Sequence, residues 1–305
     1  MSTPATSENF ADILDVRFRD IFNGLYPQMK SRIPDFFTET TSDRPEEKYS
    51  ALTDMGPLQL FTGAIAYDNS EQEYDVTATH LEYALGTQIR RKLYDDDQFG
   101  VIDEEFEKLT RSAFRTHENH AADFFNNAFS AVSSFYTHTE AVALCSDSHT
   151  TPVAGVSTTT GFDNYVTSEL SPANLTSMIT QFRGFKTGAG DFIDSTPDTL
   201  VVPVNLEDRA NEIVRTVQGL DDANQNKNVM EGRFKIVSWI RLTDVNNYWI
   251  ANQAEMKRNL LWFWRVKPET AKMESFDNII AKGRIYTRYS FLRRDWRWAL
   301  GAEVS

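Results

Sequence analysis

The chain has 305 residues, of which 41% are hydrophobic and 25% are charged, so it is long enough for a sizeable core and is not a disordered chain. Its formal net charge of -13 argues against a surface that wraps nucleic acid tightly. The charge is uneven, because residues 256–305 contain 11 Lys and Arg but only 5 Asp and Glu. An acidic chain therefore ends in a basic segment that is also rich in aromatic residues.

We expect neither a targeting signal nor a membrane anchor in this sequence. The single cysteine, Cys145, excludes an internal disulfide and suits a reducing compartment. Residues 1–15 contain neither a basic region nor an apolar run, so we expect no signal peptide. The densest apolar cluster, residues 260–264, is too short to cross a bilayer. We therefore expect no membrane partner.

The first predicted element is an amphipathic helix over residues 8–26, within an N-terminal arm. Its apolar residues follow a three/four spacing that places them on one stripe. They are Phe10, Ile13, Leu14, Ile21, Phe22 and Leu25. A single amphipathic helix cannot bury its own stripe, so the arm needs another surface.

A long β-hairpin with a loose tip is predicted over residues 58–83. Two runs with partial alternation flank a polar turn at residues 68–73. The alternating apolar residues are Phe61, Ile65 and Tyr67 in the first run and Tyr74, Val76 and Ala78 in the second. Because an isolated two-stranded hairpin is marginally stable in water, this segment also needs a partner.

The longest helical pattern covers residues 103–134. Asp103, Glu104 and Glu105 fall in its first turn, where acidic side chains complement the helix dipole. About 30 residues at about 1.5 Å each would form a rod of about 45 Å. The apolar positions that define the pattern are Ile102, Phe106, Leu109, Ala113, Phe124, Ala128 and Val132.

Shorter helices and strands alternate in the second half of the chain. Ser171 and Pro172 predict the N-cap and first position of a helix. Residues 199–202 predict a buried strand, after which Asn205 is a candidate N-cap for a helix with Glu207 in its first turn. Residues 233–240 and 247–252 predict further strands. This alternation favours an α/β or α+β central domain.

The chain ends in predicted strands that contain two Trp-x-Trp pairs. These are Trp262 with Trp264 and Trp296 with Trp298. Period two places each pair on one face of its strand.

Two groups of residues have side chains suited to catalysis or metal binding. His117 and His120 lie three residues apart on the long helix, but the four-residue step of a zincin motif is missing. Cys145 and His149 have the residue types of a thiolate and its base, although both lie in a loop-like stretch. We favour ordinary structural roles for all four and keep an enzyme as an alternative.

The C-terminal residues 283–301 interleave Arg with Tyr, Phe and Trp. This mixture suits either a single-strand nucleic-acid binder or a protein–protein interface. Because the rest of the chain is acidic, we favour the interface.

Two stretches resemble the C-terminal half of tailed-bacteriophage major capsid proteins, most closely the Mu-type major head subunit family. Residues 197–210 have the pattern P-x-x-L-V-V-P-x-x-L-E-x-x-A, and residues 232–237 have G-x-F-x-I-V before an aromatic pair. The matching residues are Pro197, Leu200, Val201, Val202, Pro203, Leu206, Glu207, Ala210, Gly232, Phe234, Ile236, Val237, Tyr248 and Trp249.

This resemblance implies the α+β Johnson (Hong Kong 97-type) fold of tailed-phage major capsid proteins. That fold has an N-terminal arm, an extended hairpin called the E-loop, a peripheral domain with a long spine helix, and an α/β axial domain. We expect the arm at 1–48, the E-loop hairpin at 49–90, the peripheral domain at 91–140 and the axial domain at 141–255. Residues 256–305 are expected to return to the peripheral domain and to form the C-terminal strands.

The same resemblance implies the major capsid protein of a tailed double-stranded DNA phage or prophage. Its copies would form hexamers and pentamers of an icosahedral shell in the virion, assembled in the host bacterial cytoplasm. Implied partners are other copies, a scaffold or head-maturation protease, the portal, a decoration protein and, weakly, packaged DNA. An encapsulin-like nanocompartment shell is the alternative. We expect no enzymatic activity, catalytic residue, cofactor or metal.

Candidate subunit-interface residues are predicted at the hairpin tip and in the C-terminal aromatic segment. They are Tyr67, Asp68, Asn69, Ser70, Glu71, Tyr74, Arg293, Arg294, Trp296 and Trp298.

Overall fold

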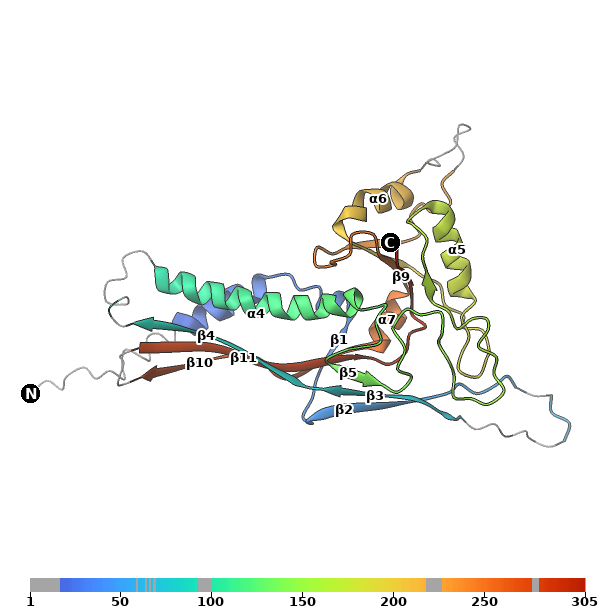
Figure 1. The fold of residues 1–305 in the computed structure, drawn as a ribbon, viewed down its shortest axis with the longest axis horizontal. Helices are drawn as coiled ribbons and strands as arrows, with labels where there is room; N and C mark the ends of the chain where they lie inside the picture. Colours follow the sequence, from blue (N-terminus) through green and yellow to red (C-terminus); the bar gives the residue numbers. More distant parts are fainter. Residues whose placement is uncertain are drawn as a thin grey trace, which may run out of the picture.

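The computed structural model describes residues 17–58, 60–63, 65, 67, 70–90, 92, 100–217, 227–275 and 280–304. The molecule is elongated: a long sheet with a covering helix forms one end, a second sheet with shorter helices forms a body, and a hairpin projects past this body (Figure 1). The three parts correspond to three separate sheets. Helices and sheets are mixed along the chain, as expected for the α+β class.

The long sheet has the strand order β1-β10-β11-β4. Its strands are β1 (Thr38–Thr41), β10 (Leu260–Ser275), β11 (Ile280–Arg293) and β4 (Leu81–Arg90). β11 is antiparallel to both β10 and β4, whereas β1 from the arm runs parallel to β10. The arm is therefore part of the sheet rather than only a cover for it.

The predicted long helix is α4 (Val101–Asn126), which begins near the expected residue and ends eight residues before the expected Ser134. It ends at Asn127, whose side-chain amide donates to the Asp123 carbonyl at 2.8 Å. On the sheet side, Phe106 stacks on Phe18 at 4.4 Å. A side chain at Gly283 would come within 3.2 Å of the Phe106 ring, so glycine at this strand position lets the ring pack closely on the sheet.

The arm helix covers the same face of the long sheet as α4. Residues 17–25 are helical, and residues 8–16 of the predicted helix lie outside the described residues. Phe18 is buried in a cluster with Ile102, Phe106 and Ile285. The apolar stripe of the arm is therefore buried within its own subunit, at least along this part.

The body is built on a five-stranded sheet with the order β6-β12-β9-β7-β8. These strands are β6 (Tyr165–Val166), β12 (Ala299–Ala302), β9 (Tyr248–Ala251), β7 (Thr199–Val202) and β8 (Lys235–Ser238). Every residue of β7, β9 and β12 is buried, which explains their continuous apolar sequences.

The helices of the body are α5 (Pro172–Arg183), α6 (Glu207–Arg215) and α7 (Gln253–Asn259). The Ser171 hydroxyl accepts from the Asn174 amide at 3.2 Å, which confirms the predicted N-cap of α5. The predicted N-cap at Asn205 is wrong, because a 3-10 turn (Val204–Leu206) precedes α6 and no side chain caps it. Residues 203–206 therefore serve as the connection between β7 and α6.

The hairpin consists of β2 (Glu46–Leu52) and β3 (Gln72–Thr79), and β5 (Tyr136–His138) adds a third strand beside β3. Its first strand therefore lies earlier than predicted, because residues 58–67 form no strand where they are described. β4 lies within the range 49–90 expected for the hairpin, but the chain leaves the hairpin at His80 and β4 joins the long sheet. The hairpin connects directly to the long sheet through this strand.

β12 differs from the expected grouping of residues 256–305, because it lies in the five-stranded sheet and not beside β10 and β11. Buried aromatic rings join the two parts; Phe125 of α4, for example, packs against Trp249 of β9 with the ring centroids 5.6 Å apart. The remaining domain boundaries stay predictions.

Candidate functional site

The loop between β2 and β3, which we call the hairpin tip (residues 53–71), carries exposed apolar side chains. Those of the tip and of adjacent Leu52 are each at least 64% exposed. They are Leu52, Met55, Leu58, Leu60, Phe61, Ile65 and Tyr67. Full burial of one such side chain contributes about 1.5–3 kcal/mol, and monomeric proteins seldom expose clusters of this kind. The tip is therefore the strongest candidate for a protein–protein contact.

The tip contains part of the predicted interface set. Tyr67 is 87% exposed, Glu71 is exposed and Ser70 is half-buried. Asp68 and Asn69 lie outside the described residues. The prediction did not include the exposed leucines and Met55, although one signal marks them: residues 49–89 contain no Lys or Arg, so no positive charge interrupts the apolar cluster.

The C-terminal part of the predicted interface needs correction. Arg293, Trp296 and Trp298 are buried at 1–3% exposure, and both tryptophans lie in the turn before β12 rather than on a strand. The Trp298 indole donates to the Asp295 carbonyl at 2.9 Å, and the Arg293 guanidinium donates to the Val142 carbonyl. These side chains serve the interior of the subunit. Only Arg294 of this group is exposed.

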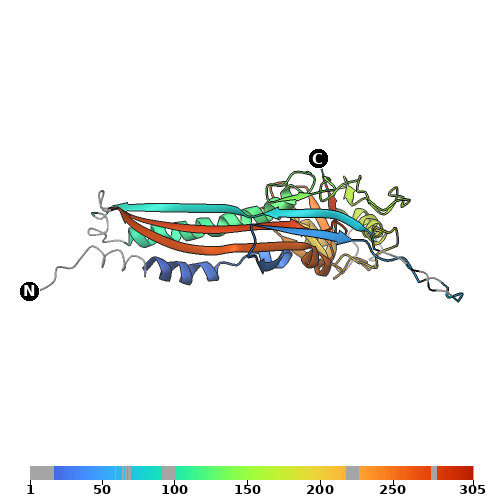
Figure 2. The same cartoon turned by 90° about the horizontal axis from the view of Figure 1, so that it is seen from below.

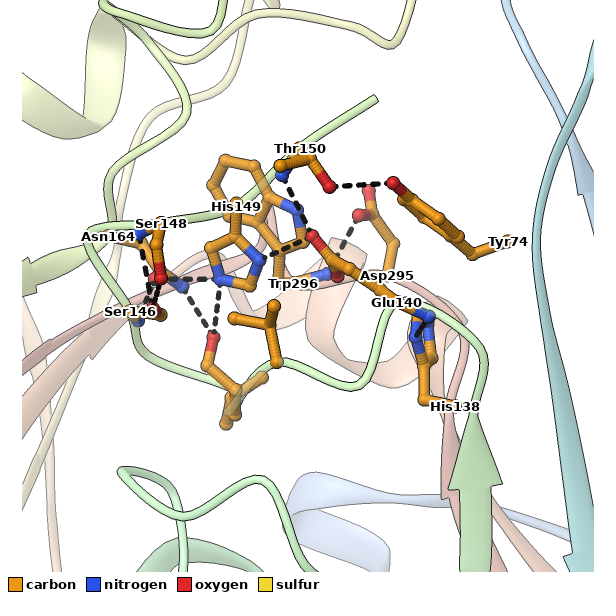
Figure 3. A network of polar contacts seen from close by, with 12 residues as sticks. Tyr74, His138, Glu140, Ser146, Ser148, His149, Thr150, Asn164, Asp295 and Trp296 are labelled. Atoms are coloured by element: carbon orange, nitrogen blue, oxygen red, sulfur yellow. Dashed lines mark hydrogen bonds and ion pairs between the residues drawn. The ribbon is translucent and has the colours of Figure 1, made fainter. Parts of the chain in front are cut away.

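The root of the hairpin, by which we mean its strands β2 and β3, is bonded to the body through β3. The Tyr74 hydroxyl on β3 lies 2.6 Å from the Thr150 hydroxyl (Figure 3). Glu73, next to it, is 3.9 Å from the Arg297 guanidinium. A side chain at Gly188 would meet the Glu73 carboxylate, so this body loop packs tightly against the root. The direction of the hairpin is thus set by contacts within its own subunit.

A buried ionisable pair lies beneath these root contacts (Figure 3). The Glu140 carboxylate accepts from the Thr150 amide at 3.0 Å and lies 2.9 Å from Nδ1 of His149. Nε2 of His149 is 3.2 Å from both the Leu144 carbonyl and the Asn164 side-chain oxygen. Both ring nitrogens of His149 therefore face oxygen atoms.

Trp296 completes this site from the C-terminal turn. Its ring stacks on His149 with the centroids 4.2 Å apart and the planes 7° apart. The side-chain amide of Asn164 donates to the carbonyls of Leu144 at 2.8 Å and of Ala299 on β12 at 3.0 Å, which holds Asn164 in place beside His149. The pair therefore links β5, the loop after it, the C-terminal turn and the five-stranded sheet.

The pKa of Glu140 reflects two opposing effects. Burial favours the neutral acid, but the hydrogen bond and charge of His149 and the Thr150 amide together hold the pKa of the carboxyl below its usual value. A carboxyl with a lowered pKa in the folded state stabilises the fold above its usual pKa, and this contribution is lost as the pH falls through the folded-state pKa.

Glu140→Gln is expected to lower the free energy of unfolding of the dissociated subunit by about 1–3 kcal/mol at pH 7, because His149 loses its charged acceptor. The difference from the unchanged protein should shrink as the pH falls below the usual carboxyl pKa of 4.5. Urea unfolding at pH 7 and in acid measures both the loss and its pH dependence, with exposed Glu104→Gln as the control. An equal difference at both pH values would contradict this role.

His117 and His120 have structural roles in the described structure. Nδ1 of His117 lies 2.9 Å from the Tyr26 hydroxyl, and burial lowers the pKa of this histidine to about 3. His120 bonds to the Tyr289 hydroxyl. Among the described residues, no three His, Cys, Asp or Glu side chains are grouped to hold a metal ion. The two histidines fill the interface between α4 and the long sheet.

Cys145 is buried, and burial raises the pKa of its thiol to about 12, so it is not a reactive thiolate at neutral pH. The polar partners of His149 are Glu140, the Leu144 carbonyl and Asn164. The arrangement does not form a nucleophile–base pair.

Comparison with known proteins identifies the family. A family model described as phage capsid protein matches residues 73–301, well over half of the chain. The chain belongs to the phage capsid protein family. A search of curated proteins finds no match. In the part of the chain that the structure describes, no helix has the length and apolar character needed to cross a membrane.

Solved phage capsid structures share the fold of this capsid protein. The asymmetric unit of the bacteriophage PhiM1 mature capsid matches with a TM-score of 0.56 and 9% identity, covering 91% of this chain and 88% of that one. The bacteriophage JBD30 procapsid matches with a TM-score of 0.55 and 12% identity, covering 99% and 76%. The capsid of the native GTA particle matches with a TM-score of 0.55 and 12% identity, covering 91% of each chain. The expected tailed-phage capsid fold is confirmed.

Proposed function

We propose that this protein is the major capsid protein of a tailed double-stranded DNA phage or prophage. Family membership and the fold shared with a mature capsid and a procapsid support this proposal. Its copies assemble as hexamers and pentamers into an icosahedral shell of the virion. Within the family we propose the Mu-type head subunit group, on the pattern at residues 197–210. The protein is structural, and we assign it no catalytic residue.

The observation that carries the assembly role is the exposed apolar hairpin tip. Seven large apolar side chains are exposed in and beside the tip. Monomeric soluble proteins seldom expose such a cluster, so the tip favours contact with another copy. The tip residues Tyr67 to Glu71 are proposed to contact a neighbouring copy. Arg294 and Tyr74 lie at the hairpin root, where Arg294 stacks over Tyr49 at 5.3 Å. We propose that these two residues support the contact from behind.

Other expected partners follow from the role of a shell. We propose that assembly takes place in the host bacterial cytoplasm with a scaffold or head-maturation protease and a portal, and that a decoration protein binds the finished shell. The acidic balance of the chain, at -13, suits a container that holds DNA with only weak contact.

Negative-stain imaging and mass measurement of the purified protein, with and without a co-expressed scaffold, test the proposal. We expect rings of five or six subunits, tubes or closed shells. A strict monomer of 34.9 kDa under every condition would overturn it. Shells that contain an enzyme cargo and no DNA would instead indicate an encapsulin-like nanocompartment.

A further inference from the structure

The chain passes between the long sheet and the hairpin at two places. Ser42 directly follows β1 of the long sheet and precedes β2 of the hairpin, and its amide donates to the Trp264 carbonyl on β10 at 3.0 Å. His80 is the single residue between β3 of the hairpin and β4 of the long sheet. Figure 2 shows, as Figure 1 does, that the blue chain enters β2 close to the point where β3 passes into β4. We call Ser42 and His80 the two crossover residues; both are buried.

The imidazole of His80 joins both crossover residues to the long sheet. Its Nε2 lies 3.1 Å from the Ser42 hydroxyl, and its Nδ1 lies 2.8 Å from the hydroxyl of Ser290 on β11. Ser290 is fully buried, at 0% exposure, and β11 is an inner strand of the sheet. One ring therefore holds together the chain that enters the hairpin, the chain that leaves it and the centre of the long sheet.

The hydrogen bonds of Ser42 determine where the proton of this ring lies. The Ser42 hydroxyl donates its single proton to the Glu47 carboxylate on β2 at 2.6 Å and accepts from the Arg44 amide at 3.2 Å. A hydroxyl oxygen has one further lone pair, so Nε2 of His80 must donate to it. Nδ1 is then the acceptor of a neutral ring, and the Ser290 hydroxyl donates to it. Each of these groups is satisfied when His80 is neutral.

A second proton on this ring is disfavoured by its surroundings. On Nδ1 it would point at the Ser290 hydroxyl, whose own proton would then lose its partner in a fully buried site. The charged groups around the ring come from β2, β10 and β11, and they are Glu47, Arg265 and Arg288. On β4, Glu82 is engaged with Arg288 at 3.6 Å. Burial and, after it, the Arg288 charge lower the pKa of His80 below its usual value of 6.5, although Glu47 opposes them.

We propose that His80 is the positioning residue of the hairpin: its neutral imidazole holds the two crossover residues together, and protonation of the ring loosens the hairpin on the long sheet. The Tyr74–Thr150 contact holds the hairpin at its body end, so the loosening is confined to the long-sheet end. The step lies within a single subunit and goes beyond the assembly role, because it makes the direction of the hairpin depend on pH before any copy meets another.

Hydrogen exchange of the dissociated subunit between pH 7 and about pH 5 tests this role. The amides of residues 42–47 and 79–82 should exchange faster as the pH falls below 6.5, after correction for the pH dependence of chemical exchange. The increase should be up to roughly tenfold per pH unit, because the open form binds one more proton than the closed form. Amides of β7 and β9 in the body are the internal reference. The pKa of Glu140 is held below 4.5, so this carboxyl stays ionised throughout.

His80→Gln is the decisive variant. Its side-chain amide still donates to Ser42 but does not titrate, so the pH dependence at the crossovers should disappear while the hairpin stays in place. His120→Gln is the matched control, because His120 bonds to the hydroxyl of Tyr289, the neighbour of Ser290 on β11, but lies on α4 and not at a crossover.

Faster exchange at the crossovers in the unchanged protein and in His120→Gln, but not in His80→Gln, supports the role of His80. Exchange in the unchanged protein that stays constant between pH 7 and about pH 5 overturns it and leaves the assembly role intact. A pH dependence that persists in His80→Gln assigns the effect to another group and also overturns it. Nitrogen-15 spectra of the histidine-labelled subunit give an independent check, since a His80 proton on Nδ1 at neutral pH contradicts the hydrogen-bond network.

Discussion

Leu60→Asp with Phe61→Asp should give a folded subunit that no longer assembles. Both side chains are at least 70% exposed in the subunit, so their replacement removes no internal contact of the core. In a shell, each would lose about 1.5–3 kcal/mol of burial, before the cost of placing a charge in an apolar contact. A loss of this size raises the assembly concentration by at least roughly a hundredfold.

Sedimentation velocity and electron microscopy measure this effect, with the thermal midpoint of the dissociated subunit as the check on folding. Val132→Asp is a suitable control, because Val132 is 78% exposed but lies in the connection between α4 and β5 and not in the hairpin tip. Full assembly of the Leu60/Phe61 variant would show that the tip is not a subunit contact. A large fall in the thermal midpoint would show that the tip serves the subunit itself.

Trp298→Ala should reduce the free energy of unfolding of the subunit by about 3–5 kcal/mol, as large-to-small changes of buried aromatic residues do. Trp298 is 1% exposed and lies against Phe124 and Phe125, with ring centroids at 6.2 and 6.4 Å. The change leaves a cavity where the end of α4 meets the body. Urea unfolding of the dissociated subunit measures it.

Arg294→Ala is the neighbouring comparison, because this exposed side chain makes a cation–π contact with Tyr49 at the surface. We expect a change in unfolding free energy within about 1 kcal/mol. Comparison of the two variants distinguishes a buried residue from an exposed one within a segment whose sequence suggests an interface along its whole length. If Trp298→Ala keeps full stability and instead blocks assembly, the original interface prediction for this tryptophan is correct.

Local signals in the sequence predicted individual elements well. Ser171 and Pro172 determine the start of α5 through a hydrogen bond and a fixed backbone angle within a few residues. The continuous apolar run at 199–202 indicates a strand buried on both faces, as β7 is. In both cases the physical cause lies within the stretch itself, so no knowledge of distant residues is needed.

The first strand of the hairpin was misplaced for a physical reason. Alternation at Phe61, Ile65 and Tyr67 normally marks a strand with one buried face, but here these side chains are exposed in the subunit. The true strand, β2, is less apolar and is half-exposed along its length. An alternating apolar pattern can arise from side chains that are buried within the subunit or from side chains that contact another copy. The pattern alone does not distinguish these two cases.

The mixture of Arg and Trp in the C-terminal segment was misleading for a related reason. Interfaces and aromatic cores both use these residues, and only the fold decides between them. Arg293 is buried because a backbone carbonyl of residue 142, distant in sequence, accepts its hydrogen bond. The buried pair of Glu140 and His149 was likewise not predictable, since it depends on how two loops pack.

The position of β12 has a consequence for synthesis on the ribosome. This strand is translated after every other strand of the five-stranded sheet, yet it lies between β6 and β9 and not at an edge. Until residues 299–302 emerge, the nascent chain has a gap inside its sheet, and β6 lacks its partner strand. A chain that terminates before this point cannot close its core. Incomplete products are thereby kept out of a structure in which one faulty copy would disturb all of its neighbours.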